Sequence, residues 1–184
     1  MQRLGIYGGT FDPIHEGHLY LIEQVISRNI VDRLLVVPAG EPQLREHAPL
    51  ASGADRKAMC IEALKDLPAE VASKVEVNSI EILRIGPSYT IDTVEAAIQS
   101  FPNYRIILIM GSDAYKKVNE WHRADDLKKL VEFVVIDRPH HPGDSTHEID
   151  ALDVSSTEVR SGQSQAVSPS VAAYIKEHNL YASK

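Results

Sequence analysis

The chain has 184 residues, of which 43% are hydrophobic and 24% are charged, and its formal net charge is -7. This length and composition are typical of one globular domain, so we predict a single domain over residues 1–184. The acidic balance argues against a protein that coats nucleic acid, and any site for an anion must be built locally. Cys60 is the only cysteine, which excludes a disulfide framework and a cysteine metal cluster.

The N-terminal residues "MQRLGIYGG" lack the apolar region of a signal peptide. No apolar run approaches the roughly eighteen residues that a membrane helix needs. We therefore expect a cytoplasmic protein with no membrane partner.

Apolar, β-branched runs alternate along the chain with segments that have the periodicity of amphipathic helices. Strands are predicted at residues 3–7, 33–37, 75–80, 105–110 and 133–137. Helices are predicted at residues 19–28, 55–67, 91–100 and 124–131. After residue 139 the chain reads "HHPGDSTHE", which is typical of a surface loop, and an apolar run at residues 149–154 and two helices follow.

Alternation of strands and helices predicts an α/β fold. The runs "LLVV" and "IILIM" are apolar throughout, as in central strands that are covered on both faces. We therefore expect a doubly wound, Rossmann-like and mainly parallel sheet with helices on both faces and a short C-terminal helical tail. Ligands bind such sheets at the carboxyl ends of the strands.

The stretch "GGTFDPIHEGH" follows the first predicted strand directly. We expect Gly8 and Gly9 to let the backbone turn sharply and approach a ligand, and the next helix to offer N–H groups to an anion. His15 and His18 are three residues apart, so they share a face if the helix has begun, and Gly17 keeps the space between them open. An ordinary strand–turn–helix connection is the alternative. A zinc site is disfavoured because no third ligand is clearly placed nearby.

A second cluster, "SSTEVR", follows the run "IDALDV". Ser155 and Glu158 match a capping box, which would start a helix without any ligand. The same helix start would direct the amides and hydroxyls of Ser156 and Thr157 outward. Arg160 lies on their face of the helix and could bind an anion.

The end of the most apolar predicted strand carries Gly111 and Asp113. Gly111 permits close approach of a ring or ribose, and Asp113 can accept hydrogen bonds from sugar hydroxyls. We expect Asp113 to be a helix N-cap at the same time. Trp121 has polar neighbours, which favours a platform for a ligand ring over a half-buried surface residue.

The stretch "GPSYT" precedes the helix that is predicted to begin near Ile91. Ser88, Tyr89 and Thr90 can cap this helix and leave its first amides facing a second anionic group.

The stretches "GGTFDPIHEGHL", "PSYTIDT", "GSDAYKKVNEW", "DRP", "VSSTEVR" and "VAAYIKEHNLY" follow one another over nearly the whole chain. In this order and spacing they resemble the bacterial nicotinate-nucleotide adenylyltransferases. The resemblance implies transfer of AMP from ATP to the phosphate of nicotinate mononucleotide, which gives deamido-NAD and pyrophosphate. It implies Mg²⁺ as a bridge on the triphosphate, without a protein cage, and no nucleic-acid partner. Whether the chain forms a homo-oligomer stays open.

The resemblance also implies roles for individual residues. His15, His18 and Arg160 would be catalytic and hold the ATP phosphates. The remaining ATP-binding residues would be Gly8, Gly9, Thr10, Phe11, Gly111, Asp113, Ser156 and Thr157. The acceptor would be bound by Arg45, Tyr89, Thr90, Trp121 and Arg138.

One stretch departs from the family pattern. Most members read "PAG-x-PPHK", whereas this chain reads "PAGEPQLR", with Leu44 for the histidine and Arg45 for the lysine. Arg45 keeps a positive charge but not the geometry of lysine.

Three other functions are compatible with these motifs. Nicotinamide mononucleotide or phosphopantetheine could be the acceptor, although "SYT" and Trp121 suit a flat ring better than a flexible arm. The chain could also be an adenylate-binding module without catalysis, but His15, His18 and Arg160 are all present, which argues against this alternative.

Overall fold

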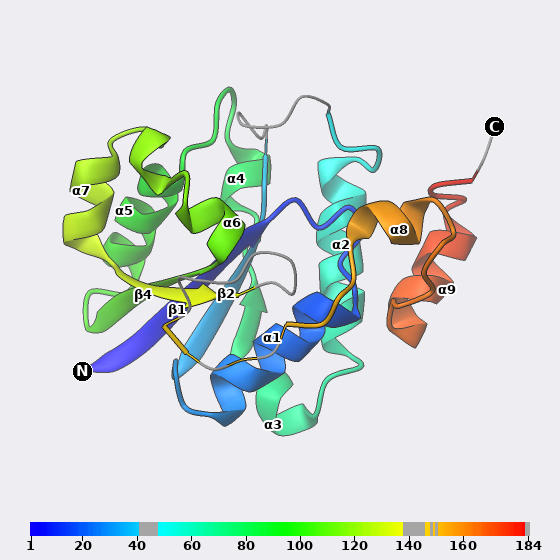
Figure 1. The fold of residues 1–184 in the computed structure, drawn as a ribbon, viewed down its shortest axis with the longest axis horizontal. Helices are drawn as coiled ribbons and strands as arrows, with labels where there is room; N and C mark the ends of the chain where they lie inside the picture. The colour runs from blue at the N-terminus through cyan, green and yellow to red at the C-terminus, as the bar shows by residue number, and fades with distance from the viewer. Residues whose placement is uncertain (41–47, 138–145, 148, 150, 183–184) are drawn as a thin grey trace.

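The computed structural model describes residues 1–40, 48–137, 146, 147, 149 and 151–182. A five-stranded sheet runs through the middle of the molecule (Figure 1). All neighbouring strands in it are parallel, in the order β3-β2-β1-β4-β5. The strands are β1 (Gln2–Gly9), β2 (Arg33–Pro38), β3 (Val75–Val77), β4 (Tyr104–Gly111) and β5 (Glu132–Ile136). The predicted doubly wound α/β fold is confirmed.

Helices cover both faces of the sheet (Figure 1). One face is covered by α1 (Glu16–Ser27), α2 (Gly53–Leu64) and α3 (Ala69–Ala72), and the other by α5 (Thr90–Ser100) and α7 (Ala124–Leu130). Short helical segments follow the carboxyl ends of two strands. They are α4 (Ile80–Leu83) after β3, and α6 (Ser112–Tyr115) and the 3-10 helix η1 (Val118–Glu120) after β4. The tail forms α8 (Ser156–Arg160) and α9 (Pro169–Glu177), and α9 packs on α2.

The two halves of the core follow from the alternation of side chains along the strands. In β1, Leu4 and Ile6 pack with Ile91 and Val94 of α5, whereas Tyr7 packs on the opposite face with the residues of α1. Successive strand residues point to opposite faces, so a strand that is apolar throughout supplies both cores at once.

The third predicted strand is shorter than expected. It ends at Val77, because the side-chain oxygen of Asn78 accepts a hydrogen bond from the N–H of Ile80 at 3.0 Å and starts α4. The helix α1 begins at Glu16, three residues before the predicted start at Leu19. The predicted two-helix tail is confirmed as α8 and α9.

The strand order also predicts where a ligand binds. The chain leaves β1 toward β2 on one side and later returns to β4 on the other, so the connections diverge between β1 and β4. The carboxyl ends of two such strands leave a crevice, which is the usual ligand site of open α/β sheets. Among the helices that the structure describes, none is both long and apolar enough to span a bilayer.

Candidate nucleotide-binding site

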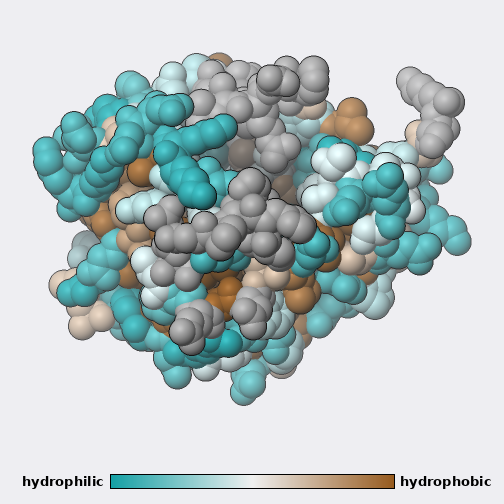
Figure 2. Space-filling model, viewed as in Figure 1, coloured by the Kyte–Doolittle hydropathy of each residue, from teal (hydrophilic) through white to brown (hydrophobic). Residues whose placement is uncertain are grey.

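A cavity of about 830 Å³ opens at the carboxyl ends of β1 and β4. Cavities that bind small molecules commonly measure roughly 300–1,000 Å³. Figure 2 shows a largely hydrophilic face with hydrophobic side chains gathered near its middle. The predicted site residues that line the cavity are Gly8, Gly9, Thr10, Phe11, His15, His18, Tyr89, Thr90, Gly111, Asp113, Trp121, Ser156, Thr157 and Arg160. Leu44, Arg45 and Arg138 lie outside the described residues.

The turn after β1 is made by Phe11 and not by the two glycines. The strand continues through Gly9, and the chain turns at Phe11, whose φ is 51°. A Cβ on Gly9 would lie 2.8 Å from the Phe11 ring, so Gly9 makes room for that buried ring. A Cβ on Gly8 would meet nothing within 4 Å. The expectation that both glycines make the turn is therefore wrong, while close approach of a ligand at Gly8 stays a prediction.

The two histidines of the first motif lie together at the start of α1. His15 is the N-cap, and its ring stacks on that of His18 with the centroids 3.6 Å apart. A Cβ on Gly17 would lie 3.1 Å from the His15 ring, so the glycine makes room for that ring. The space between the two histidines is not open as expected, because their rings stack. The backbone N–H of Glu16 donates to the carbonyl of Ala166 at 2.8 Å, so one amide of this helix start is already bound.

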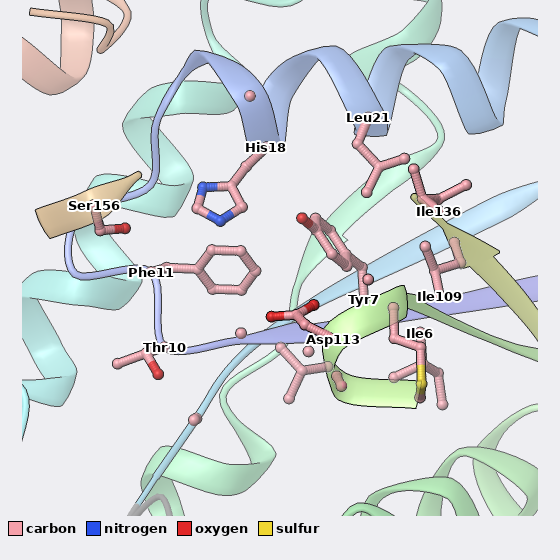
Figure 3. A pocket seen from close by; sticks show the side chains of 18 of the residues that line it. Ile6, Tyr7, Thr10, Phe11, His18, Leu21, Ile109, Asp113, Ile136 and Ser156 are labelled. Carbon is pink, nitrogen blue, oxygen red and sulfur yellow. The ribbon is translucent and has the colours of Figure 1, made fainter. Parts of the chain in front are cut away.

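A hydrogen bond fixes which nitrogen of His18 carries the proton. The backbone N–H of His15 donates to Nδ1 of His18 at 3.1 Å. Nδ1 is therefore the acceptor, and in the neutral ring the proton is on Nε2. The ring of Phe11 meets that of His18 edge to face, with the centroids 5.0 Å apart. Figure 3 shows His18 above Phe11, at the N-terminus of α1. The site thus holds an oriented imidazole with an N–H donor.

The start of α8 has the predicted capping box. The hydroxyl of Ser155 accepts from the N–H of Glu158 at 3.2 Å, and the carboxylate of Glu158 accepts from the N–H of Ser155 at 2.9 Å. The hydroxyl of Ser156 does not point outward as expected, because it donates to the carbonyl of Pro13 at 2.9 Å. This bond joins α8 to the loop after β1.

Arg160 adds a second link between α8 and this loop. Its Nη1 donates to the carbonyl of Asp12 at 2.6 Å, and its Nη2 donates to the hydroxyl of Thr157 at 3.2 Å. The Arg160 side chain is 20% exposed and lines the cavity. A guanidinium is thereby fixed at the rim, close to the His15 and His18 loop.

The segment that follows β4 contributes the carboxylate of Asp113 to the cavity wall. Gly111 is the N-cap of α6, so Asp113 lies in the first turn and is not the N-cap that the sequence allowed. Figure 3 shows the Asp113 carboxylate beside Tyr7. It can accept hydrogen bonds from a ligand that lies between β1 and β4.

Aromatic side chains line the part of the cavity nearest α5. Tyr89 is the N-cap of α5 but makes no side-chain hydrogen bond to it, and the Ser88 hydroxyl donates to the carbonyl of Glu81 at 3.3 Å. The expected side-chain cap from Ser88 and Tyr89 is therefore wrong. The Tyr89 ring stacks on His122 at 4.3 Å, and the half-buried Trp121 lines the cavity next to them.

Comparison with known proteins assigns the family. A model described as cytidylyltransferase-like matches residues 6–162. A protein of Shouchella clausii named "Probable nicotinate-nucleotide adenylyltransferase" is 34% identical over 98% of this chain and 97% of its own length. A protein of the same name from Bacillus pumilus is 33% identical over 100% of both chains. The chain belongs to the nicotinate-nucleotide adenylyltransferases.

A solved structure of this family has the same fold. The Plasmodium falciparum nicotinic acid mononucleotide adenylyltransferase, complexed with NaAD, matches with a TM-score of 0.80 over 98% of each chain, at 21% identity. At this identity the likeness establishes the fold alone.

Two positions in this adenylyltransferase fold were missed by sequence reasoning. The buried guanidinium of Arg56 in α2 donates to the carbonyl of Thr10 at 2.7 Å and so anchors the loop after β1. Glu81 lines the cavity and accepts from the Thr93 hydroxyl at 2.9 Å, and burial raises the pKa of its carboxyl group. No motif marks either residue, because each position depends on contacts between distant segments.

Proposed function

We propose that this chain transfers the adenylyl group of ATP to the phosphate of nicotinate mononucleotide, forming deamido-NAD and releasing pyrophosphate. The observation that carries the proposal is one cavity lined by a fixed imidazole, a fixed guanidinium and an aromatic wall. Relatives that match almost the whole chain carry the name of this activity, which supports the same assignment.

The reaction is an in-line displacement at phosphorus. An oxygen of the acceptor phosphate forms a bond to the α-phosphorus of ATP, and the bond from that phosphorus to the bridging oxygen breaks. The electron pair of the broken bond leaves with pyrophosphate. The attacking oxygen is already ionised, so no general base is required, and catalysis depends on positioning and charge stabilisation.

The donors at the mouth of α1 and at α8 suit the triphosphate. Nε2–H of His18 would donate to an oxygen on which charge develops, with His15 beside it. Arg160, with the helix start at Ser156 and Thr157, would bind the phosphates that leave. Thr10 completes this wall of the cavity.

The remaining walls suit the nucleosides. Gly111 and Asp113 would hold adenosine, and Gly8 would let it approach β1. Tyr89, Thr90 and Trp121 would hold the pyridine ring. Binding of the acceptor by Arg45 and Arg138 remains a prediction from the sequence.

Magnesium would enter on the triphosphate. Mg²⁺ retains several waters and is commonly held through substrate phosphates with one or two carboxylates, and Asp113 is a carboxylate that lines this cavity. Among residues that the structure describes, no group of three or more His, Cys, Asp or Glu side chains could hold a metal ion.

A cytoplasmic location and a single domain over residues 1–184 remain predictions from the sequence.

Pyrophosphate release measured with a panel of acceptors tests the proposal. The panel comprises nicotinate mononucleotide, nicotinamide mononucleotide, phosphopantetheine and ATP alone. We expect the highest rate with nicotinate mononucleotide, with deamido-NAD as the second product. Faster release with another acceptor would contradict the choice of acceptor, and ATP binding without release would identify a binding module.

A further inference from the structure

The C-terminal tail returns to the loop that carries the histidines. The hydroxyl of Tyr181 donates to Oδ1 of Asp12 at 2.7 Å, although 169 positions separate the two residues in the sequence. Asp12 is 4% exposed and Tyr181 is half-buried, so this bond is partly shielded from solvent. Burial and the neighbouring Asp12 carboxylate raise the pKa of the Tyr181 phenol, which therefore keeps its proton.

The Asp12 carboxylate is held by neutral donors. Oδ1 also accepts from the N–H of Ala51 at 3.0 Å, and Oδ2 accepts from the N–H of Leu50 at 2.8 Å. The guanidinium of Arg160 lies 3.9 Å from Oδ2 and binds the backbone carbonyl of Asp12 instead, at 2.6 Å. Arg160 is therefore held by the backbone of Asp12, and its guanidinium does not form a close ion pair with the Asp12 carboxylate.

Loss of the phenol hydroxyl would change this balance. Oδ1 would keep only the N–H of Ala51, and the loss of a donor to a buried carboxylate is costly. The guanidinium of Arg160 is 3.9 Å from Oδ2, so the carboxylate would turn toward it. An Arg160 in a close ion pair with Asp12 has fewer N–H groups directed at a phosphate.

We propose that Tyr181 is a positioning residue of the triphosphate site, which fixes the Asp12 carboxylate and thereby the guanidinium of Arg160 without touching the substrate. This inference rests on the proposed function for the identity of the ligand. It gives the C-terminal segment a role in nucleotide binding in addition to its packing on α2.

The tail itself supplies a matched control. The hydroxyl of Tyr174 in α9 donates to the Asp55 carboxylate of α2 at 3.0 Å. Tyr174 and Asp55 do not line the cavity. Tyr181→Phe and Tyr174→Phe each remove one phenol–carboxylate hydrogen bond from the same tail.

The test uses both variants in the full chain. Calorimetry measures the Kd of Mg-ATP, steady-state assays with nicotinate mononucleotide measure the KM for ATP, and thermal unfolding measures the Tm. We expect both variants to lower the Tm to a similar extent. Only Tyr181→Phe should weaken ATP binding, by about tenfold, as expected for a charge-assisted hydrogen bond. Equal ATP affinity in the two variants would overturn the inference.

A second measurement asks whether Tyr181 acts through Arg160. Tyr181→Phe is combined with Arg160→Lys, and the two losses in ATP affinity are compared with the loss in the double variant. Residues that act through one contact give non-additive effects. Additive losses would contradict a route through Arg160. A wild-type chain that binds Mg-ATP but adenylylates no acceptor would refute the proposed function, and the binding measurements would still decide the role of Tyr181.

Discussion

The imidazole of His18 has one proton position in the neutral ring, because Nδ1 accepts from the N–H of His15. A donor whose direction is set before the substrate arrives stabilises developing charge without reorganising. The Phe11 ring and the stacked His15 ring limit rotation of the imidazole. At the scale of single residues, this orientation assigns His18 an effect on turnover.

Replacement of His18 with alanine should lower kcat by about a hundredfold or more, which is the usual effect of removing one such donor. The control is His178→Ala, because His178 is an exposed residue of the tail that stacks on Tyr174. It should keep the wild-type kcat. A raised KM with an unchanged kcat in His18→Ala would contradict a role in the transition state.

Arg160→Lys keeps the positive charge but loses the planar fork of donors. It should weaken ATP binding about tenfold, which corresponds to roughly 1.4 kcal/mol. Arg28→Lys, at the other end of α1, is the matched control and should bind ATP normally. The measurement is the Kd of Mg-ATP, and full affinity in Arg160→Lys would rule out bidentate recognition.

The carboxyl end of β1 contains two neighbouring glycines with different surroundings. Gly9→Ala would bring its Cβ to 2.8 Å from the Phe11 ring and should destabilise the fold by roughly 1–3 kcal/mol. Gly8→Ala meets no atom within 4 Å, so the Tm should be unchanged or slightly higher, while ATP binding should weaken. Thermal unfolding and calorimetry separate the two effects. Equal Tm values would contradict the packing argument.

The ion pair between β1 and the turn before β2 gives a dependence on pH. Hydrogen bonds from Arg3 lower the pKa of Asp32 in the folded state. The stability that Asp32 contributes is therefore present above its unfolded pKa of about 4 and is lost as the pH falls through the lower folded value. The two side chains are 38% and 34% exposed, so solvent screening keeps this contribution small.

Asp32→Asn should accordingly flatten the decrease of the Tm below about pH 4. Asp125→Asn, at a side chain that is 91% exposed, is the control and should follow the wild-type curve. Parallel curves for the wild-type and Asp32→Asn chains would refute the linkage.

Elements could be predicted where periodicity carries the information. The apolar strands β1, β2 and β4 and the amphipathic helices α1, α2 and α5 occur close to their predicted positions. The prediction failed where one side chain decides the conformation, as with Asn78 at the end of β3 and Phe11 after β1. The partnership of Asp12 with Tyr181 could not be predicted, because no local pattern couples residues 169 positions apart.

Across the whole molecule, the sheet separates two kinds of chemistry within one cavity. The part near α1 and α8 carries the oriented imidazole and guanidinium, and the part near α5 carries the aromatic rings. The C-terminal helices complete the first part, since α8 bonds to the loop after β1 through Ser156 and Arg160. We therefore expect that substitutions near α1 and α8 change the binding of ATP, and that substitutions near α5 change the choice of the nucleotide that accepts the adenylyl group.

The acceptor preference gives the last prediction. The N-cap of α5 is Tyr89, whose side chain makes no hydrogen bond to the N–H groups at the start of the helix. A nicotinate carboxylate near Thr90 would meet N–H groups there. A neutral amide loses the charge and presents an N–H₂ donor there instead. Charge-assisted hydrogen bonds contribute roughly 1.5–3 kcal/mol, so kcat/KM for nicotinamide mononucleotide should be about ten- to a hundredfold lower or more.

Trp121 provides the internal control for this preference. Both rings stack similarly, so Trp121→Ala should lower kcat/KM for both mononucleotides and leave their ratio nearly unchanged. The measurement is kcat/KM for each mononucleotide at saturating Mg-ATP, in the wild-type chain and in the variant. Equal wild-type values or a reversed order would overturn the nicotinate preference and leave adenylyl transfer intact. A ratio that collapses in Trp121→Ala would show that the ring itself, and not the start of α5, discriminates between the acceptors.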